Sequence, residues 1–197
     1  MSIRKSISFS FTAQVINTLI GFITSVIITR ILGPEGRGEQ ALFVNSIAFA
    51  VLFFGFSINS TIPYFINSGK AKAEELLTTI SVFVLGSTAL VFISLQLLKA
   101  TGKLDIALPA NMQSIQYVII FTGMYFTNLM SSVISTFLAA YKKFREISIY
   151  TILSQLLPLL LYLLVYFNVI PHQTNNPFKA VVMIMAFVAL VSFIAIM

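Results

Sequence analysis

The sequence predicts an all-α integral membrane protein of about six transmembrane helices, and its composition and length both indicate this fold class. Hydrophobic residues make up 58% of the chain and charged residues only 9%, whereas soluble domains carry roughly 25% charged residues. A helix that crosses a bilayer needs about 20 apolar residues, so the 197 residues allow roughly six or seven crossings. This leaves almost no sequence for a water-soluble domain.

Six apolar runs separated by short polar connections define the predicted spans. A single six-helix transmembrane lobe is therefore expected over residues 1–197, with spans at approximately 7–31, 40–66, 74–98, 113–140, 147–170 and 178–197.

The boundaries of the first three spans follow from local chemistry. Gly33 and Pro34 end the first span, because glycine is favoured just past a helix end and proline cannot continue the helix. A short polar turn is expected over residues 35–39. Glu74 and Glu75 favour the start of the third span, since carboxylates stabilise the positive end of the helix dipole.

Two prolines fall inside predicted spans. Pro63 lies near the end of the second span and Pro158 lies in the middle of the fifth. A proline in a helix leaves a backbone carbonyl without its donor, which favours a bend. We expect bent helices at both positions.

The basic residues predict the orientation in the membrane. With six spans, the side of the N-terminus receives seven of them, Arg4, Lys5, Lys70, Lys72, Lys142, Lys143 and Arg145. The opposite side receives five, Arg30, Arg37, Lys99, Lys103 and Lys179. The positive-inside rule then places the N-terminus in the cytoplasm.

No recognisable catalytic or metal site is present, so we expect neither an enzyme nor a bound cofactor. All six acids lie in loops or at helix ends, cysteine is absent, and the one histidine, His172, lies in a loop without a neighbouring metal ligand. The net charge of +6 does not indicate nucleic-acid binding, because the basic residues form small groups between apolar runs.

Polar residues inside the spans recur at helical spacing and are candidates for substrate contact. The first span carries Gln14, Asn17, Thr18, Gly21 and Ser25 on one face, the second carries Asn45 and Asn59, the fourth carries Asn128, Ser131, Ser132, Ser135 and Thr136, and Gln155 lies in the fifth. Small and polar residues allow helices to pack closely and to bond across their interfaces, and this interpretation suits the serines. The amides Gln14, Asn17, Asn45, Asn59 and Gln155 either do the same or line an aqueous cavity.

Arg30 lies one turn before Gly33 and permits two interpretations. Its charged head either extends to the membrane interface, which is the commoner behaviour, or points into the helix bundle. An inward guanidinium is suited to bind a phosphate or pyrophosphate group through two parallel hydrogen bonds.

The stretch Thr29–Gly38, which reads TRILGPEGRG, resembles the signature region of a family of bacterial membrane proteins. These are the polysaccharide and lipid-linked oligosaccharide flippases of the multidrug/oligosaccharidyl-lipid/polysaccharide exporter superfamily. Further stretches are similar in order and spacing, namely Tyr64–Ile66, then Lys143–Arg145 followed by Gln155, Pro158 and Tyr162. Arg37 departs from the resemblance, because many relatives carry an aromatic residue there.

The resemblance implies two six-helix lobes around a central cavity and the transfer of an undecaprenyl-diphosphate-linked oligosaccharide across the bacterial inner membrane by alternating access. This chain would then be the N-terminal lobe, completed by a C-terminal lobe or an oligomeric partner. The apolar end at Met197 agrees with the expectation that the chain is part of a longer one. Arg30 would bind the diphosphate, and the five amides would bind sugar hydroxyls or water.

Three alternatives remain open at this stage. A cation-coupled drug exporter of the same superfamily would need a carboxylate within the membrane, and none is visible in this sequence. A structural membrane subunit would use its small-residue faces to bind a partner and would transport nothing. A membrane enzyme acting on lipids is disfavoured because no acid or histidine lies within a span.

Overall fold

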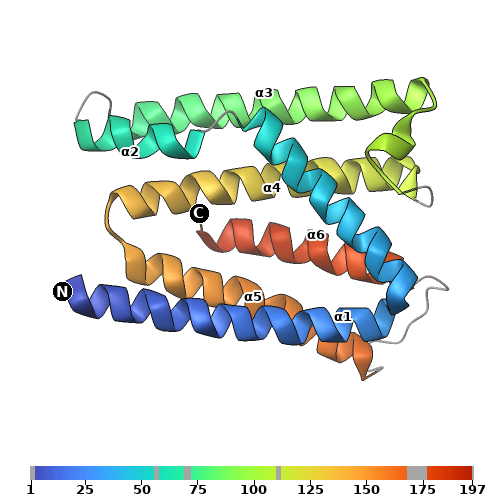
Figure 1. Ribbon diagram of the computed structural model, residues 1–197. Helices are drawn as coiled ribbons and strands as arrows, with labels where there is room; N and C mark the ends of the chain where they lie inside the picture. The colour runs from blue at the N-terminus through green and yellow to red at the C-terminus, as the bar shows by residue number, and fades with distance from the viewer. Residues whose placement is uncertain (1–2, 56–57, 69–71, 110–111, 168–176, 197) are drawn as a thin grey trace. The chain divides into compact units, whose positions relative to one another are not determined.

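The computed structural model describes residues 3–55, 58–68, 72–109, 112–167 and 177–196, and this part of the chain is helical without any strand. The elements are α1 (Ile3–Phe54), α2 (Ile58–Ser68), α3 (Ala73–Ala100), the short 3₁₀ helix η1 (Leu104–Ile106), α4 (Ile115–Ala140), α5 (Phe144–Tyr166) and α6 (Pro177–Ile196) (Figure 1). The predicted all-α fold class is confirmed.

Four helices among the described residues are long and apolar enough to cross a membrane. These stretches are Phe11–Phe54, Glu74–Ala100, Ile115–Ala140 and Phe144–Tyr166, and a shorter apolar helix covers Phe178–Ser192. Large apolar side chains on their surfaces are strongly exposed, including Phe11 (71%) and Leu52 (71%). Such surfaces are unfavourable in water and favourable in hydrocarbon, so the chain is a membrane protein.

Helix α1 is interrupted at Gly33, where the backbone has φ 71° and ψ 177°. This conformation is open almost only to glycine, because a Cβ would meet the flanking backbone. The 52 residues of α1 would extend about 78 Å as one straight helix, more than twice the hydrocarbon thickness of about 30 Å. The break therefore separates two helical stretches, each long enough for one crossing.

The segment after the break differs from the expectation of a polar turn at residues 35–39, because it is helical. Pro34 follows the non-helical residue and takes the first position of the new helical stretch. A proline fits there, since the first N–H groups of a helix have no partner within the helix.

The second predicted span is interrupted at a glycine, before its proline. α1 ends at Phe54, Gly55 follows in a bend, and α2 begins at Ile58. A Cβ at Gly55 would collide with the carbonyl oxygen of Val51, so the chain comes too close to itself there for a larger residue. Pro63 lies inside α2, which continues to Ser68. α5 likewise continues through Pro158 to Tyr166.

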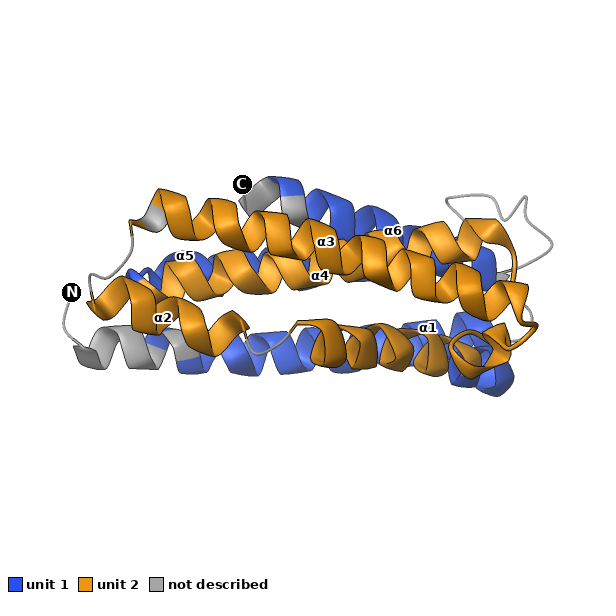
Figure 2. Cartoon of the chain, turned by 90° about the horizontal axis from the view of Figure 1, so that it is seen from above, with its two compact units in different colours: residues 1–38, 141–197 blue, residues 39–140 orange. Residues whose placement is uncertain are grey.

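The chain divides into two compact units, which Figure 2 shows in different colours. Unit 1 comprises residues 1–38 and 141–197, and therefore holds the first stretch of α1 together with α5 and α6. Unit 2 comprises residues 39–140, with the second stretch of α1 and helices α2, α3 and α4. Each unit is described by itself below.

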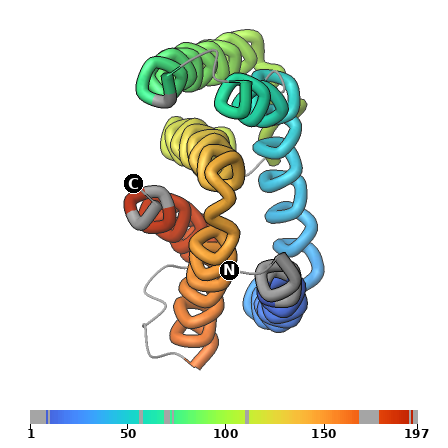
Figure 3. Tube along the Cα trace, turned by 90° about the vertical axis from the view of Figure 1, so that its left-hand side faces the viewer, coloured from blue at the N-terminus to red at the C-terminus, as the bar shows by residue number. Residues whose placement is uncertain are grey.

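Helix α4 forms the centre of unit 2 and packs against both α2 and α3, whose long axes Figure 3 views almost end-on. Its buried side chains recur at helical spacing and include Val118, Phe121, Tyr125, Leu129, Val133 and Phe137. The ring of Phe121 meets that of Phe43, from the second stretch of α1, edge to face at 5.7 Å. This geometry is favourable for aromatic pairs.

Unit 1 has its own apolar core, to which all three of its helices contribute. The buried members are Ile20, Ile27 and Ile28 from α1, Leu159 and Tyr162 from α5, and Val181 from α6. Because α1 meets α5 through this cluster, polar residues on the same faces of these helices are also brought together.

Gly33→Ala is expected to lower the stability of the folded protein by about 1–3 kcal/mol, because alanine avoids this backbone conformation. Gly38→Ala is the matched control, since Gly38 lies in a helix with an ordinary φ and has open space where a Cβ would lie. Alanine there should be neutral or stabilising. Denaturation in detergent, followed by circular dichroism, measures the stability of both variants. Equal stabilities would contradict the inference that the backbone at Gly33 needs a glycine.

Candidate functional site

Asn17 on α1 is the buried amide around which the candidate site is built. Its side chain is only 7% exposed, and its Nδ2 donates a hydrogen bond to Oγ1 of Thr151 on α5 at 3.2 Å. Its carbonyl oxygen Oδ1 is also buried and has no hydrogen-bond partner within the described residues. A buried acceptor without a donor costs about 1–3 kcal/mol, so this oxygen is suited to accept a bond from water or from a bound molecule.

One turn further along both helices, Gln155 of α5 reaches Gly21 of α1. A Cβ added at Gly21 would lie 3.6 Å from Oε1 of Gln155, so the amide lies directly against the glycine backbone. The first contact joins Asn17 to Thr151, and the second joins Gly21 to Gln155, four residues later on each helix. The two helices therefore run in the same direction within unit 1.

Arg37 completes this set of polar groups from beyond the helix break. Its Nη2 donates a hydrogen bond to Oγ of Ser25 at 3.0 Å, and both side chains are partly buried. Ser25 lies two turns after Asn17 on the same face, a separation of about 12 Å along the helix. We refer to Asn17, Ser25, Arg37, Thr151 and Gln155 as the polar track of unit 1.

Arg30 and Gln14 lie outside the polar track. Arg30 is exposed, and its Nη1 donates a long hydrogen bond of 3.4 Å to the hydroxyl of Tyr166, at the end of α5. This position agrees with the interpretation in which its head extends to the interface. Gln14 is exposed on α1.

In unit 2, Asn59 uses both atoms of its amide to join α2 to α4. Its Nδ2 donates to Oγ of Ser132 at 2.7 Å, and its Oδ1 accepts from Oγ1 of Thr136 at 3.3 Å. These bonds agree with the helix-contact interpretation of the polar stripe on α4. Asn128 donates to the carbonyl oxygen of Met124 in its own helix, and Asn45 is exposed.

Sequence reasoning missed several of these partners. The hydroxyl of buried Tyr125 donates to Oγ of buried Ser87 at 3.1 Å, which joins α4 to α3. The pairing of Arg37 with Ser25 does not follow from the sequence, because helical spacing from Ser25 cannot be continued through the break at Gly33. Thr151 could have been found from its spacing of four residues before Gln155. His172 lies outside the described residues.

The described residues thus define an all-helical membrane protein with a buried polar track in one unit. Residues 3–197 match the family described as "polysaccharide biosynthesis protein", and the chain belongs to this family. The match extends over nearly the whole chain and confirms the resemblance drawn from the sequence. No curated protein and no solved structure matches the chain.

Thr151→Val is expected to lower stability by about 1 kcal/mol, because it leaves the buried Nδ2 of Asn17 without an acceptor. Adding Asn17→Leu should restore most of that stability, since replacing both polar partners with apolar groups is nearly neutral. Thr18→Val is the control, because exposed Thr18 bonds only to the carbonyl oxygen of Gln14 in its own helix. Unfolding in detergent is measured for the natural protein, the Thr151→Val and Asn17→Leu single variants, the double variant and the control. Strictly additive effects of the two single substitutions would argue against the Asn17–Thr151 bond.

Proposed function

We propose that this protein is a flippase, which moves an oligosaccharide linked to undecaprenyl diphosphate across the bacterial inner membrane. Membership of the polysaccharide biosynthesis family and the apolar helices both support this proposal. The observation that carries it is the buried, unpartnered oxygen of Asn17 within a polar track that also holds the guanidinium of Arg37.

The chemistry of the polar track suits the two parts of such a substrate. Sugar hydroxyl groups donate hydrogen bonds, and the Oδ1 of Asn17 is an acceptor that lacks a donor. The amide of Gln155 offers both a donor and an acceptor one turn away. Arg37 has the planar set of donors that fits phosphate oxygens. The arrangement binds and orients a substrate, and we propose that no covalent bond is made or broken.

Arg37 is a stronger candidate than Arg30 for binding the diphosphate group of the substrate. Its partly buried head already bonds to Ser25 inside the track, whereas Arg30 is exposed and bonds to exposed Tyr166. The electrostatic attraction between a guanidinium and a phosphate is stronger where water is partly excluded. Contact with the substrate stays a prediction for four further residues, namely Gln14, Asn45, Asn59 and Arg30.

The proposed mechanism is alternating access by two lobes. Transporters of this kind bind substrate near the bilayer midplane and rock one bundle against the other. We propose that the chain supplies one six-helix lobe and that a second lobe, continuous with it or in a partner chain, completes the pathway. We propose that the N-terminus lies in the cytoplasm, because the excess of basic residues on its side favours this orientation.

A non-transporting structural subunit is the second candidate. It is favoured by Asn59, whose Nδ2 and Oδ1 each form a hydrogen bond to a hydroxyl of α4 and so join α2 to α4. Small and polar faces of this kind hold helices together without any transported molecule. The transport measurement below separates the two functions.

Arg37→Ala is expected to reduce transfer of the lipid-linked oligosaccharide about tenfold, because it removes a charge-assisted hydrogen-bond donor. Arg30→Ala is the matched control, with the same substitution seven residues earlier, and we expect a much smaller loss. Transfer is measured in sealed inverted membrane vesicles, as protection of the labelled sugar from an impermeant glycosidase. The full-length gene product is used throughout, and its amount is checked for each variant.

Three results of this measurement would change the conclusion. No transfer by the natural protein in vesicles that contain the substrate would reject the flippase and favour the structural subunit. Full transfer by Arg37→Ala would remove Arg37 from the substrate site. A larger loss with Arg30→Ala than with Arg37→Ala would return the diphosphate site to Arg30.

A further inference from the structure

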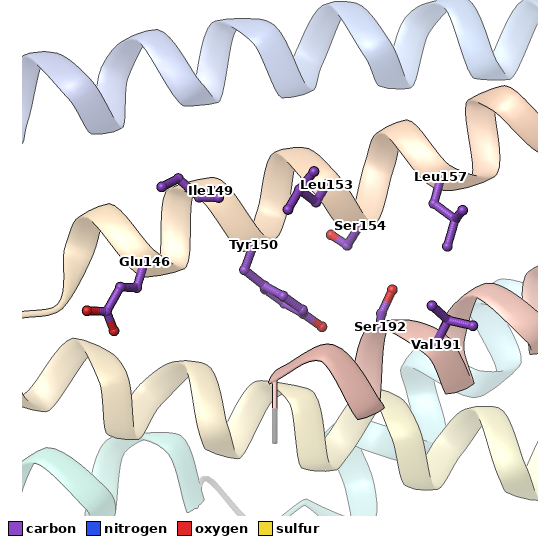
Figure 4. A pocket seen from close by; sticks show the side chains of 8 residues that line it. All are labelled: Glu146, Ile149, Tyr150, Leu153, Ser154, Leu157, Val191 and Ser192. Atoms are coloured by element: carbon purple, nitrogen blue, oxygen red, sulfur yellow. The ribbon is translucent and has the colours of Figure 1, made fainter.

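A groove between α5 and α6 of unit 1 lies outside the polar track. Its volume is about 490 Å³, and its walls include Ile149, Tyr150, Leu153 and Leu157 of α5 with Val191 and Ser192 of α6 (Figure 4). The α5 residues recur every three or four positions, so they form one face of the helix. Most of the groove is apolar, and the hydroxyls of Tyr150, Ser154 and Ser192 are its neutral polar groups.

The groove begins at a basic turn. Glu146 lines its first end, and Lys142, Lys143 and Arg145 lie within the four residues before Glu146. Glu146 forms an ion pair with Lys143 at 3.5 Å. Lys142 and Arg145 are exposed, and no ion pair is recorded for either within the described part of the chain. The turn that precedes the groove therefore carries two exposed positive charges besides the Lys143–Glu146 pair.

The length of the groove corresponds to one leaflet of a bilayer. From Glu146 to Leu157 the α5 face extends over eleven residue steps, about 16 Å at the rise of an α-helix. Half of a hydrocarbon core of about 30 Å is about 15 Å. The four charged residues at positions 142, 143, 145 and 146 place the mouth at the membrane–water interface, because charges are unfavourable within hydrocarbon.

We propose that this groove binds an anionic phospholipid, with its phosphate at Lys142 and Arg145 and one acyl chain between α5 and α6. An apolar channel of one leaflet's depth fits an acyl chain, and the two unneutralised cations fit the phosphate. The hydroxyls of Tyr150 and Ser192 line the groove and can donate hydrogen bonds to the ester oxygens of the lipid. Basic pockets between transmembrane helices on the cytoplasmic side bind anionic headgroups in this way. The site is separate from the polar track and does not depend on the proposed flippase activity.

Residues 1–197 contain no tryptophan, so a single tryptophan introduced into them reports on lipid at one place in this chain. Leu153→Trp puts the reporter in the groove, because Leu153 lines it and is 59% exposed. Leu160→Trp is the matched control, since Leu160 lies on the same helix, is 55% exposed and does not line the groove. Each protein is reconstituted into mixtures of phosphatidylcholine with brominated phosphatidylglycerol, or with brominated phosphatidylcholine, and fluorescence quenching is measured.

At position 153 we expect brominated phosphatidylglycerol to bind about fivefold more strongly than brominated phosphatidylcholine, as a cation near the headgroup implies. At position 160 the two lipids should quench equally. Lys142→Gln with Arg145→Gln should abolish the preference at position 153 and leave position 160 unchanged.

Three outcomes would overturn the proposal. The first is equal quenching by the two lipids at position 153. The second is the same preference at both positions, which would indicate a general surface effect. The third is displacement of phosphatidylglycerol from position 153 by an equimolar polyprenyl diphosphate, which would assign the groove to the tail of a transported lipid.

Discussion

The backbone at Gly33 is the constraint on which the arrangement of unit 1 depends. With φ 71° and ψ 177°, it ends one helical stretch and lets Pro34 begin the next. The residues that follow can then turn back, and Arg37 reaches Ser25, twelve residues earlier in the chain. In an unbroken helix, twelve residues would separate these two positions by about 18 Å along the axis. The guanidinium of Arg37 therefore joins the polar track because the backbone at position 33 has a conformation that only glycine adopts without strain.

Buried Asn17 in unit 1 and exposed Asn59 in unit 2 differ in how their amide atoms are bonded, and this difference identifies the candidate site. An amide in hydrocarbon is unfavourable unless its atoms are bonded. Asn59 in unit 2 satisfies both atoms with hydroxyls of α4, which is sufficient to explain it as a helix contact. Asn17 in unit 1 satisfies its donor with Thr151 but not its acceptor. A residue that served packing alone would be replaced by leucine at little cost, so the unpartnered oxygen indicates a further partner.

The hydrocarbon of the lipid bilayer explains both the apolar exterior and the apolar groove between α5 and α6. Side chains such as Phe22, which is 70% exposed, are stable on a surface only where lipid covers it. Tyr150, Ser154 and Ser192 add hydroxyls to a groove that is otherwise apolar, and the basic turn before α5 marks where the hydrocarbon ends. Unit 1 thus combines a polar track between α1 and α5 with a largely apolar groove between α5 and α6, which we propose binds a lipid.

The sequence by itself determined the all-α membrane class and the break at Gly33, because apolar run length, glycine and proline act locally and need no neighbouring helix. It also selected Asn17 from its helical spacing with other polar residues, and Gln155 as an amide within an apolar span. Only the tertiary structure decided that the second predicted span is interrupted at Gly55, that Arg37 and not Arg30 joins the polar track, and that Asn59 is already paired. These outcomes depend on the approach of residues far apart in the chain, and periodicity cannot be followed through a break in a helix or from one helix to another.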